Sequence, residues 1–166
     1  LSDIDARYDG LEMGAQARAR QLVELSATPD VQDSLIALSQ RRPIAEGQLG
    51  WSAILGLGTS GTGPGVAYLL DSMSATNSPD AYTQALARVG TEEGRESLLS
   101  AASGEYRGVT TAVQVAAIHA LAAFPDANTI GLLDRLVSSA SPAVSNAAAQ
   151  TLTVVLPAQE VEAVRP

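Results

Sequence analysis

Three glycines, Gly56, Gly58 and Gly61, have the spacing G-x-G-x-x-G that dinucleotide-binding proteins use to bring backbone close to a pyrophosphate. This pattern binds a nucleotide where it joins a β-strand to the N-terminus of a helix. Here Ile54 and Leu57 have helical spacing and no strand pattern follows, so the context argues against a nucleotide site. We expect a flexible loop between two helices instead.

Other residue types that support catalysis or metal binding are sparse. The chain has one histidine, His119, and no cysteine, and it lacks the H-E-x-x-H spacing of a zinc protease. The acidic residues Glu92, Glu93 and Glu96 are close together, but acids at this density are typical of the first turn of a helix, where they complement its dipole. We therefore predict no catalytic residue, no cofactor and no metal site, and an exposed position for His119.

Charge restricts the class of partner. All ten basic residues are arginine, and 18 acidic residues give a formal net charge of −8. A nucleic-acid-binding protein needs a positive surface to displace counterions from phosphates, so this balance argues against DNA or RNA. The longest uncharged run is rich in glycine and unsuited to spanning a bilayer, so we predict no membrane insertion. A protein partner with a basic patch would complement the acidic surface.

A pair of apolar residues three apart recurs along the chain at steps of 32, 32, 35 and 31 residues. A period near 30 is typical of repeat proteins, in which each unit buries its apolar face against its neighbours. We expect these pairs to lie in the core on the first helix of each repeat. The pairs are Leu22/Leu25, Ile54/Leu57, Leu86/Val89, Leu121/Phe124 and Leu152/Val155.

Adjacent leucines, or leucine and isoleucine, mark a second helix in four repeats, at Leu35/Ile36, Leu69/Leu70, Leu98/Leu99 and Leu132/Leu133. Asp30, Glu92 and Asp126 stand in the short segments before these helices, where we expect them to cap the helix N-termini. The predicted fold is all-α, with a helical domain over residues 1–156 and a tail over 157–166. The predicted helices are 11–26, 30–40, 45–57, 64–75, 79–89, 92–103, 110–124, 127–139 and 142–156.

The segment Val113 to Phe124, followed by Ile130-Gly-Leu-Leu-Asp-Arg-Leu136 and Ser141-Pro-Ala-Val144, resembles the short HEAT-like repeats found also in phycobilisome lyases. The resemblance covers about residues 11–156 and is strongest after residue 109. It implies a right-handed α-solenoid of about four helical hairpins plus a terminal helix.

In proteins of this kind, second helices line a concave face that commonly binds a protein partner, so the resemblance implies a non-catalytic scaffold or adaptor. Two alternatives are a lyase-type or small-ligand module, with a pocket near Trp51 and Tyr68, and a structural segment of a longer repeat protein. Cytoplasmic and periplasmic or secreted locations are both compatible with the sequence. The positions that the register assigns to partner binding are Asp33, Tyr68, Asp71, Arg95, Glu96, Asp134 and Arg135.

Overall fold

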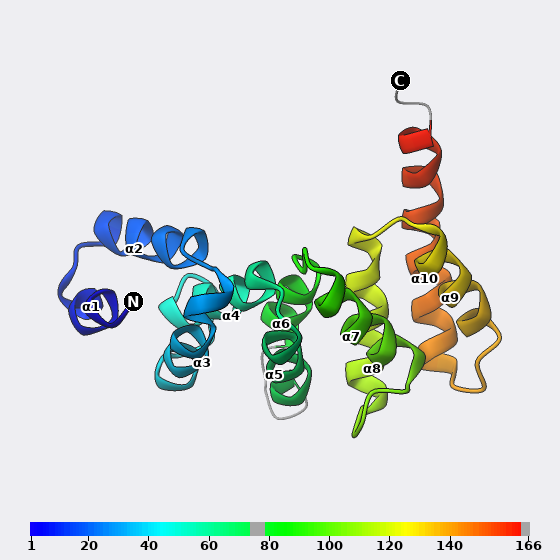
Figure 1. The fold of residues 1–166 in the computed structure, drawn as a ribbon, viewed down its shortest axis with the longest axis horizontal. Helices are drawn as coiled ribbons and strands as arrows, with labels where there is room; N and C mark the ends of the chain where they lie inside the picture. Colours follow the sequence, from blue (N-terminus) through cyan, green and yellow to red (C-terminus); the bar gives the residue numbers. More distant parts are fainter. Residues whose placement is uncertain (74–78, 164–166) are drawn as a thin grey trace. The chain divides into compact units, whose positions relative to one another are not determined.

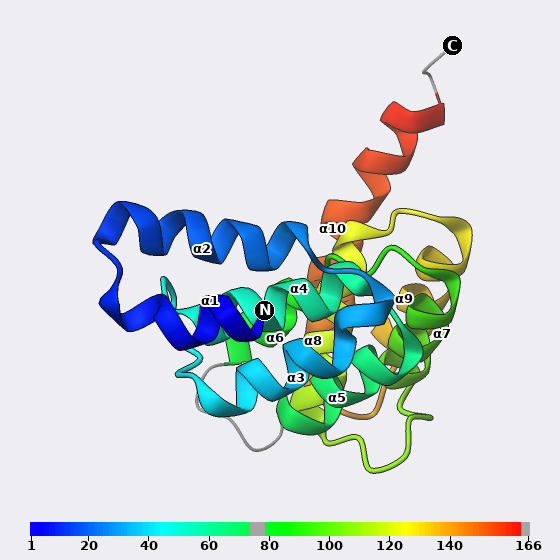
Figure 2. The same ribbon diagram turned by 60° about the vertical axis from the view of Figure 1, so that its left-hand side comes forward.

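The computed structural model describes residues 1–73 and 79–163, and within these ranges every regular element is a helix. This confirms the all-α prediction. The chain divides into two compact units, Leu1–Arg95 and Glu96–Pro166. The helices of both units are labelled in Figure 1, and Figure 2 shows them from a second direction.

The first unit contains six α-helices among its described residues, and the predicted helices from residue 11 onward match them to within a few residues at each end. It adds a short N-terminal helix that the apolar periodicity did not indicate. The elements are α1 (Ser2–Arg7), η1 (Tyr8–Gly10), α2 (Met13–Leu25), η2 (Pro29–Val31), α3 (Gln32–Arg41), α4 (Leu49–Ser60), α5 (Gly63–Met73) and α6 (Pro79–Leu86). Helix α7 (Glu92–Ser103) begins in this unit and continues into the next.

Helix α4 is the centre of the first unit, where it packs against α2, α3, α5 and α6 (Figure 1). Ten of its residues are buried, including the predicted core pair Ile54 and Leu57. At Gly58 the backbone of α4 comes so close to α6 that a Cβ would overlap the carbonyl of Ala85. Glycine is therefore required at this position by helix packing, with no role for a ligand.

The expectation of a flexible loop around the glycine pattern is wrong. Gly56 and Gly58 lie inside α4, and Gly61 ends that helix in the left-handed conformation with φ of 63°. Only Gly61 and Thr62 separate α4 from α5. Thr62 then begins α5, because its hydroxyl accepts a hydrogen bond of 3.1 Å from the backbone N–H of Gly65.

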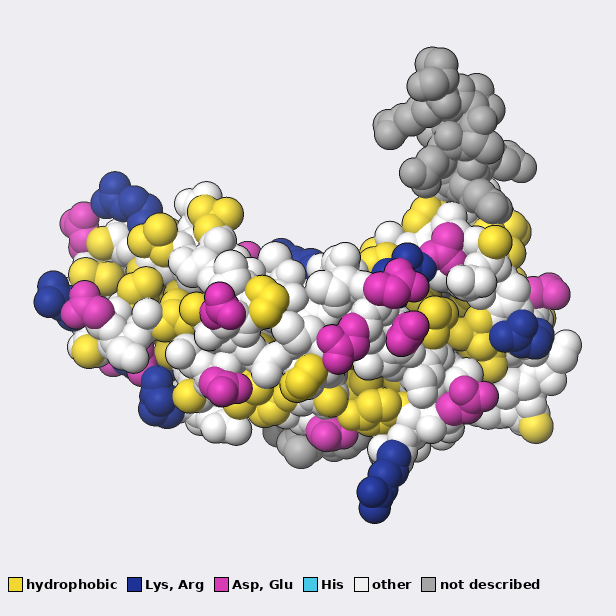
Figure 3. All heavy atoms as spheres, in the orientation of Figure 1, with side chains coloured by type: hydrophobic (Ala, Val, Ile, Leu, Met, Phe, Trp, Pro, Cys, Tyr) yellow, Lys and Arg dark blue, Asp and Glu magenta, His cyan; other side chains and the backbone are white. Residues whose placement is uncertain are grey.

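The expectation that the first apolar pair lies in the core is also wrong. Leu22 and Leu25 are 53% and 74% exposed, while Ala19 and Val23 of the same helix are buried. Apolar side chains reach the surface in this part of the chain in Figure 3. Among the described helices, α2 makes its main long-helix contact with α4, whereas α4 packs against α2, α3, α5 and α6.

An ionic cluster attaches α1 to the end of α3. Arg42 donates to Asp5 Oδ1 at 2.6 Å and to Asp9 Oδ2 at 2.7 Å, and Arg41 donates to Asp5 Oδ2 at 2.9 Å. The hydrogen bond from Arg42 holds the pKa of Asp5 below its ordinary value of 3.8, with a further lowering by Arg41, although partial burial opposes the shift. Asp9 and Asp5 correspondingly raise the pKa of Arg42.

The second unit continues from α7 through α8 (Thr111–Ala120), η3 (Leu121–Ala123), α9 (Ala127–Val137) and α10 (Pro142–Ala163). Helix α10 packs against α8, η3 and α9 (Figure 2). We expected the last helix to end at residue 156 and a tail to begin at 157, but α10 passes through Pro157 and continues to Ala163. Among the described residues, no helix is both long and apolar enough to span a bilayer.

Helix starts agree only partly with the predicted acidic caps. Asp126 does cap α9, since its Oδ1 accepts a bond of 2.9 Å from the N–H of Thr129. Helix α7 is instead capped by Thr91, which accepts from the N–H of Gly94 at 3.1 Å, and Glu92 is the first helical residue. Asp30 lies in η2, and α3 begins without a side-chain cap. Threonine thus takes a role that we had assigned to an acid.

Candidate functional site

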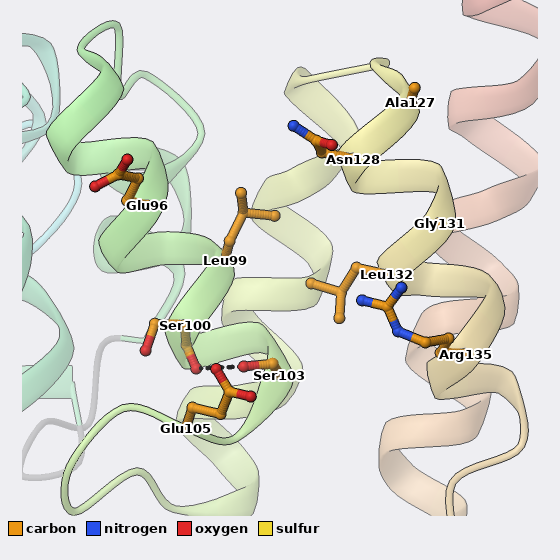
Figure 4. A pocket seen from close by; sticks show the side chains of 10 residues that line it. All are labelled: Glu96, Leu99, Ser100, Ser103, Glu105, Ala127, Asn128, Gly131, Leu132 and Arg135. Atoms are coloured by element: carbon orange, nitrogen blue, oxygen red, sulfur yellow. Dashed lines mark hydrogen bonds between the residues drawn. The ribbon is translucent and has the colours of Figure 1, made fainter.

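A groove with a volume of about 430 Å³ separates α7 from α9 within the second unit (Figure 4). We call it the α7–α9 groove. This volume lies in the range of ordinary ligand sites in proteins. Its lining comes from α7, from the segment that follows α7, and from the first three turns of α9. The lining residues are Glu96, Leu99, Ser100, Ser103, Glu105, Ala127, Asn128, Gly131, Leu132 and Arg135.

Paired leucines on α7 and α9 position the walls of the groove. Leu98 on α7 and Leu133 on α9 are fully buried and fix each helix to the core of the unit. Their neighbours Leu99 and Leu132 line the groove and point toward one another across it in Figure 4. The first doublet thus has a buried and a partly exposed leucine, while in the second both leucines are buried and Leu132 also lines the groove.

Four charged or amide side chains of the α7–α9 groove make no hydrogen bond or ion pair with the described part of the chain: Glu96, Glu105, Asn128 and Arg135. All four side chains are exposed. A side chain with no internal partner keeps its hydrogen-bonding groups available to a ligand, and Asn128 offers both donors and an acceptor. Ser103, by contrast, donates to the backbone oxygen of Ser100 at 3.0 Å.

Two of the seven predicted partner-binding residues, Glu96 and Arg135, line this groove. Asp134 is exposed on α9 beside it but is not part of the lining. The other four, Asp33, Tyr68, Asp71 and Arg95, lie in the first unit. Two of the seven predicted residues therefore line the groove, and the other five do not.

In the first unit, Asp33 and Asp71 are exposed on α3 and α5, and Arg95 is partly exposed on α7. The hydroxyl of Tyr68 is hydrogen-bonded to Ser39 Oγ at 2.9 Å and so joins α5 to α3. The groove includes neither Trp51 nor Tyr68, the residues near which the alternative of a small-ligand module would place a pocket. Tyr68 thus contributes a contact between two helices, and its role in partner binding stays a prediction.

The residue that opens the groove was not among the predicted site residues. When the leucine doublets are aligned, Gly131 stands where α5 has Tyr68, directly before the doublet. A Cβ at Gly131 would have Arg135 Nη1, at 4.0 Å, as its nearest neighbour outside the local backbone, so the space beside it is free. A comparison of the residues directly before the leucine doublets could have indicated this site, because α9 has a glycine at the position where α5 has the large side chain of tyrosine.

The side chains that first suggested chemistry do not form a catalytic arrangement in the described part of the chain. His119 is exposed, as predicted, and its Nδ1 lies 3.4 Å from Thr151 Oγ1 of α10. Within residues 1–73 and 79–163, no three acidic or histidine side chains are grouped as metal ligands would be. The α7–α9 groove combines an apolar floor with separated charges, which suits binding by contact and hydrogen bonding.

Comparison of the chain with family models, with curated proteins and with solved structures finds no significant match, so its function has to be inferred from its own residues.

Proposed function

We propose that this chain is a non-catalytic interaction module of the HEAT-like type, which binds a segment of a protein partner in the α7–α9 groove. The observation that carries the proposal is the groove itself: an apolar floor of Leu99 and Leu132, bordered by Glu96, Asn128 and Arg135 with no internal partner among the described residues. Apolar contact surrounded by available polar groups is the usual composition of a protein interface.

Packing within the units supports the HEAT-like part of the proposal. In the first unit α4 contacts α2 and α6, the helices in the equivalent position of the preceding and following hairpins, and α3 contacts α5. In the second unit α8 and α9 both contact α10. Contacts between equivalent helices of successive hairpins are those of an α-solenoid, in which second helices form the binding face.

The charges of the groove support a protein partner on the second helices. Arginine, which is enriched at interfaces, is placed at the groove as Arg135. The lining has two carboxylates and one guanidinium, so it complements a partner with basic groups better than an acidic one. The proposed contact surface is the groove, with Asp134 beside it and Asp33, Asp71 and Arg95 as secondary positions on the remaining second helices.

Selection from a displayed library of random peptides tests this function even though the partner is unidentified. Peptides are selected on the immobilised full chain, and their affinities are measured for two leucine-to-arginine variants. Leu99→Arg places a charge on the groove floor, while Leu25→Arg makes the same change at an exposed site on α2, where the side chain is 74% exposed.

We expect selected peptides to lose at least about tenfold in affinity for Leu99→Arg, as for the loss of a central apolar contact, and to bind Leu25→Arg as they bind the wild type. Circular dichroism verifies that both variants keep their helices. Peptides that bind Leu99→Arg as tightly as the wild type would contradict the proposal, as would a selection that enriches no peptide.

A further inference from the structure

The charges along the α7–α9 groove are not evenly placed. Figure 4 shows Glu96 and Asn128 at the end where α7 and α9 begin, Leu99 and Leu132 midway, and Glu105 and Arg135 toward the opposite end. Arg135 thus provides a cation at the same end as Glu105. Asn128, the polar residue of α9 at the Glu96 end, is an uncharged amide, so this end of the groove has a carboxylate and no cation from α9.

The rest of the second unit reinforces the negative charge at that end. Asp126 lies just before α9 and caps it, close in sequence to Asn128. Residues 96–157 include four acids, Glu96, Glu105, Asp126 and Asp134, and two arginines, Arg107 and Arg135. A positive side chain entering at the Glu96 end would therefore gain attraction from Asp126 and from the net negative charge of the unit, in addition to one direct ion pair.

The spacing between Glu96 and Leu99 on α7 determines the position of the basic side chain in a bound peptide. Glu96 precedes Leu99 by three residues, which is about 4.5 Å along a helix axis. In an extended peptide, side chains on one face recur every second residue, about 6.6 Å apart. The long, flexible stems of lysine and arginine readily cover the difference of about 2 Å.

We propose, as a refinement that rests on the proposed function, that the groove selects an extended segment in which a basic residue stands two positions from a large apolar residue. The apolar side chain occupies the floor between Leu99 and Leu132, and the basic side chain pairs with Glu96. Arg135 donates to backbone carbonyl oxygens of the segment at the far end, because its five N–H groups have no hydrogen-bond or ion-pair partner among the described residues.

The test uses a peptide library in which an apolar residue is fixed and each neighbouring position is varied, with amidated and acetylated ends. Enrichment is compared for the wild type, Glu96→Arg and Glu92→Arg. Glu92 is an exposed residue on the same helix outside the lining, so its reversal makes the same change in net charge without altering the groove.

We expect the wild type and Glu92→Arg to enrich lysine or arginine two positions from the apolar residue. Glu96→Arg should bind those peptides at least about fivefold more weakly at low salt and should enrich aspartate or glutamate at the same position. This reversal is specific to the assigned residue, because a general charge effect would appear in both variants.

Two results would overturn the inference and are distinguishable from failure of the proposed function. A basic preference that persists unchanged in Glu96→Arg would place the cation elsewhere. Binding that is lost in Leu99→Arg yet shows no preference for a basic residue would retain the groove as a binding site and remove its assigned specificity. Binding that is insensitive to Leu99→Arg would instead remove the proposed function together with the inference.

Discussion

The space between α3 and α5 and the space between α7 and α9 are both flanked by second helices of successive hairpins, but they are filled differently. Ser39 and Tyr68 join α3 to α5 through a hydrogen bond of 2.9 Å, and Thr62 at the start of α5 donates to the side chain of Gln32. Between α7 and α9 the corresponding position is Gly131, and a groove remains.

This difference shows that the space between two such helices can be either closed by a polar contact or left open as a groove. A large side chain that reaches the adjacent helix forms hydrogen bonds with its polar groups and fills the space between the two helices. A glycine leaves that space open and leaves nearby polar groups without partners. Because unpaired groups on a wet surface carry little penalty, the open version is tolerated where solvent can enter.

The first unit has further polar contacts that join helices of successive hairpins. Glu24 on α2 accepts from Ser52 of α4 at 3.1 Å and from Arg88, just after α6, at 2.9 Å. Thr91 donates to the backbone oxygen of Gly61. Polar contacts thus connect successive hairpins of this unit through their first helices and through their second helices. Many polar side chains of the unit are therefore engaged in contacts between hairpins.

The largest predicted effect concerns the close approach of α4 to α6. Gly58→Ala introduces a methyl group where it would overlap the Ala85 carbonyl, so the helices must separate. We expect a loss of about 3 kcal/mol or more in the free energy of unfolding, measured by urea denaturation.

Gly14→Ala on α2 is the matched control, because nothing lies within 4 Å of the added Cβ. It should stabilise the chain by about 0.5–1 kcal/mol, since alanine is the better helix former. If Gly58→Ala were as stable as Gly14→Ala, α4 and α6 would not pack as closely as described.

A smaller effect is expected from removing the polar joint between α3 and α5. Tyr68→Phe deletes the hydroxyl while it keeps the ring, so it should cost about 1 kcal/mol in the free energy of unfolding. A double-mutant cycle with Ser39→Ala isolates the interaction between the two side chains. A coupling energy of zero would show that this joint adds nothing to the closed space.

The smallest effect is the pH dependence of the ionic cluster on α1. The folded-state pKa of Asp5 is below its ordinary value of 3.8, so its contribution to stability is fully present above that value and is lost as the pH falls through the folded pKa. We expect the free energy of unfolding of the wild type to fall more steeply below about pH 4 than that of Asp5→Asn. Parallel pH profiles for the two proteins would contradict this description of the cluster.

Sequence patterns predicted the helices well and the surfaces poorly. The doublets Leu98/Leu99 and Leu132/Leu133 located α7 and α9 because helical burial leaves a clear periodic signal. Helix α1 was missed, since it has no buried residue and is held by ion pairs that periodicity does not detect. Leu22 and Leu25 were misassigned because the same repeat column is covered in α4 and open in α2.

Only part of the candidate site could be predicted from the sequence. The charge pattern indicates which side chains are exposed, but the hydrogen bonds and ion pairs within the fold decide which of them are available to a partner. Glu96 and Arg135 were found, while Asn128 was not. The sequence does not show that the hydroxyl of Tyr68 is hydrogen-bonded to Ser39 of the preceding hairpin. Which polar residue meets a partner depends on the side chain one hairpin away, and this relation becomes visible only when the helices are packed.

The most direct measurement compares the affinity of a selected groove-binding peptide for the wild type, Gly131→Ala and Gly131→Tyr. Gly131→Tyr places in α9 the side chain that closes the space between α3 and α5, and both substitutions replace a helical glycine, so neither should destabilise α9. We predict wild-type affinity for Gly131→Ala and a loss of at least about tenfold for Gly131→Tyr, with no decrease in the free energy of unfolding. Undiminished affinity of Gly131→Tyr for the peptide would contradict the central claim that this open space is the binding site.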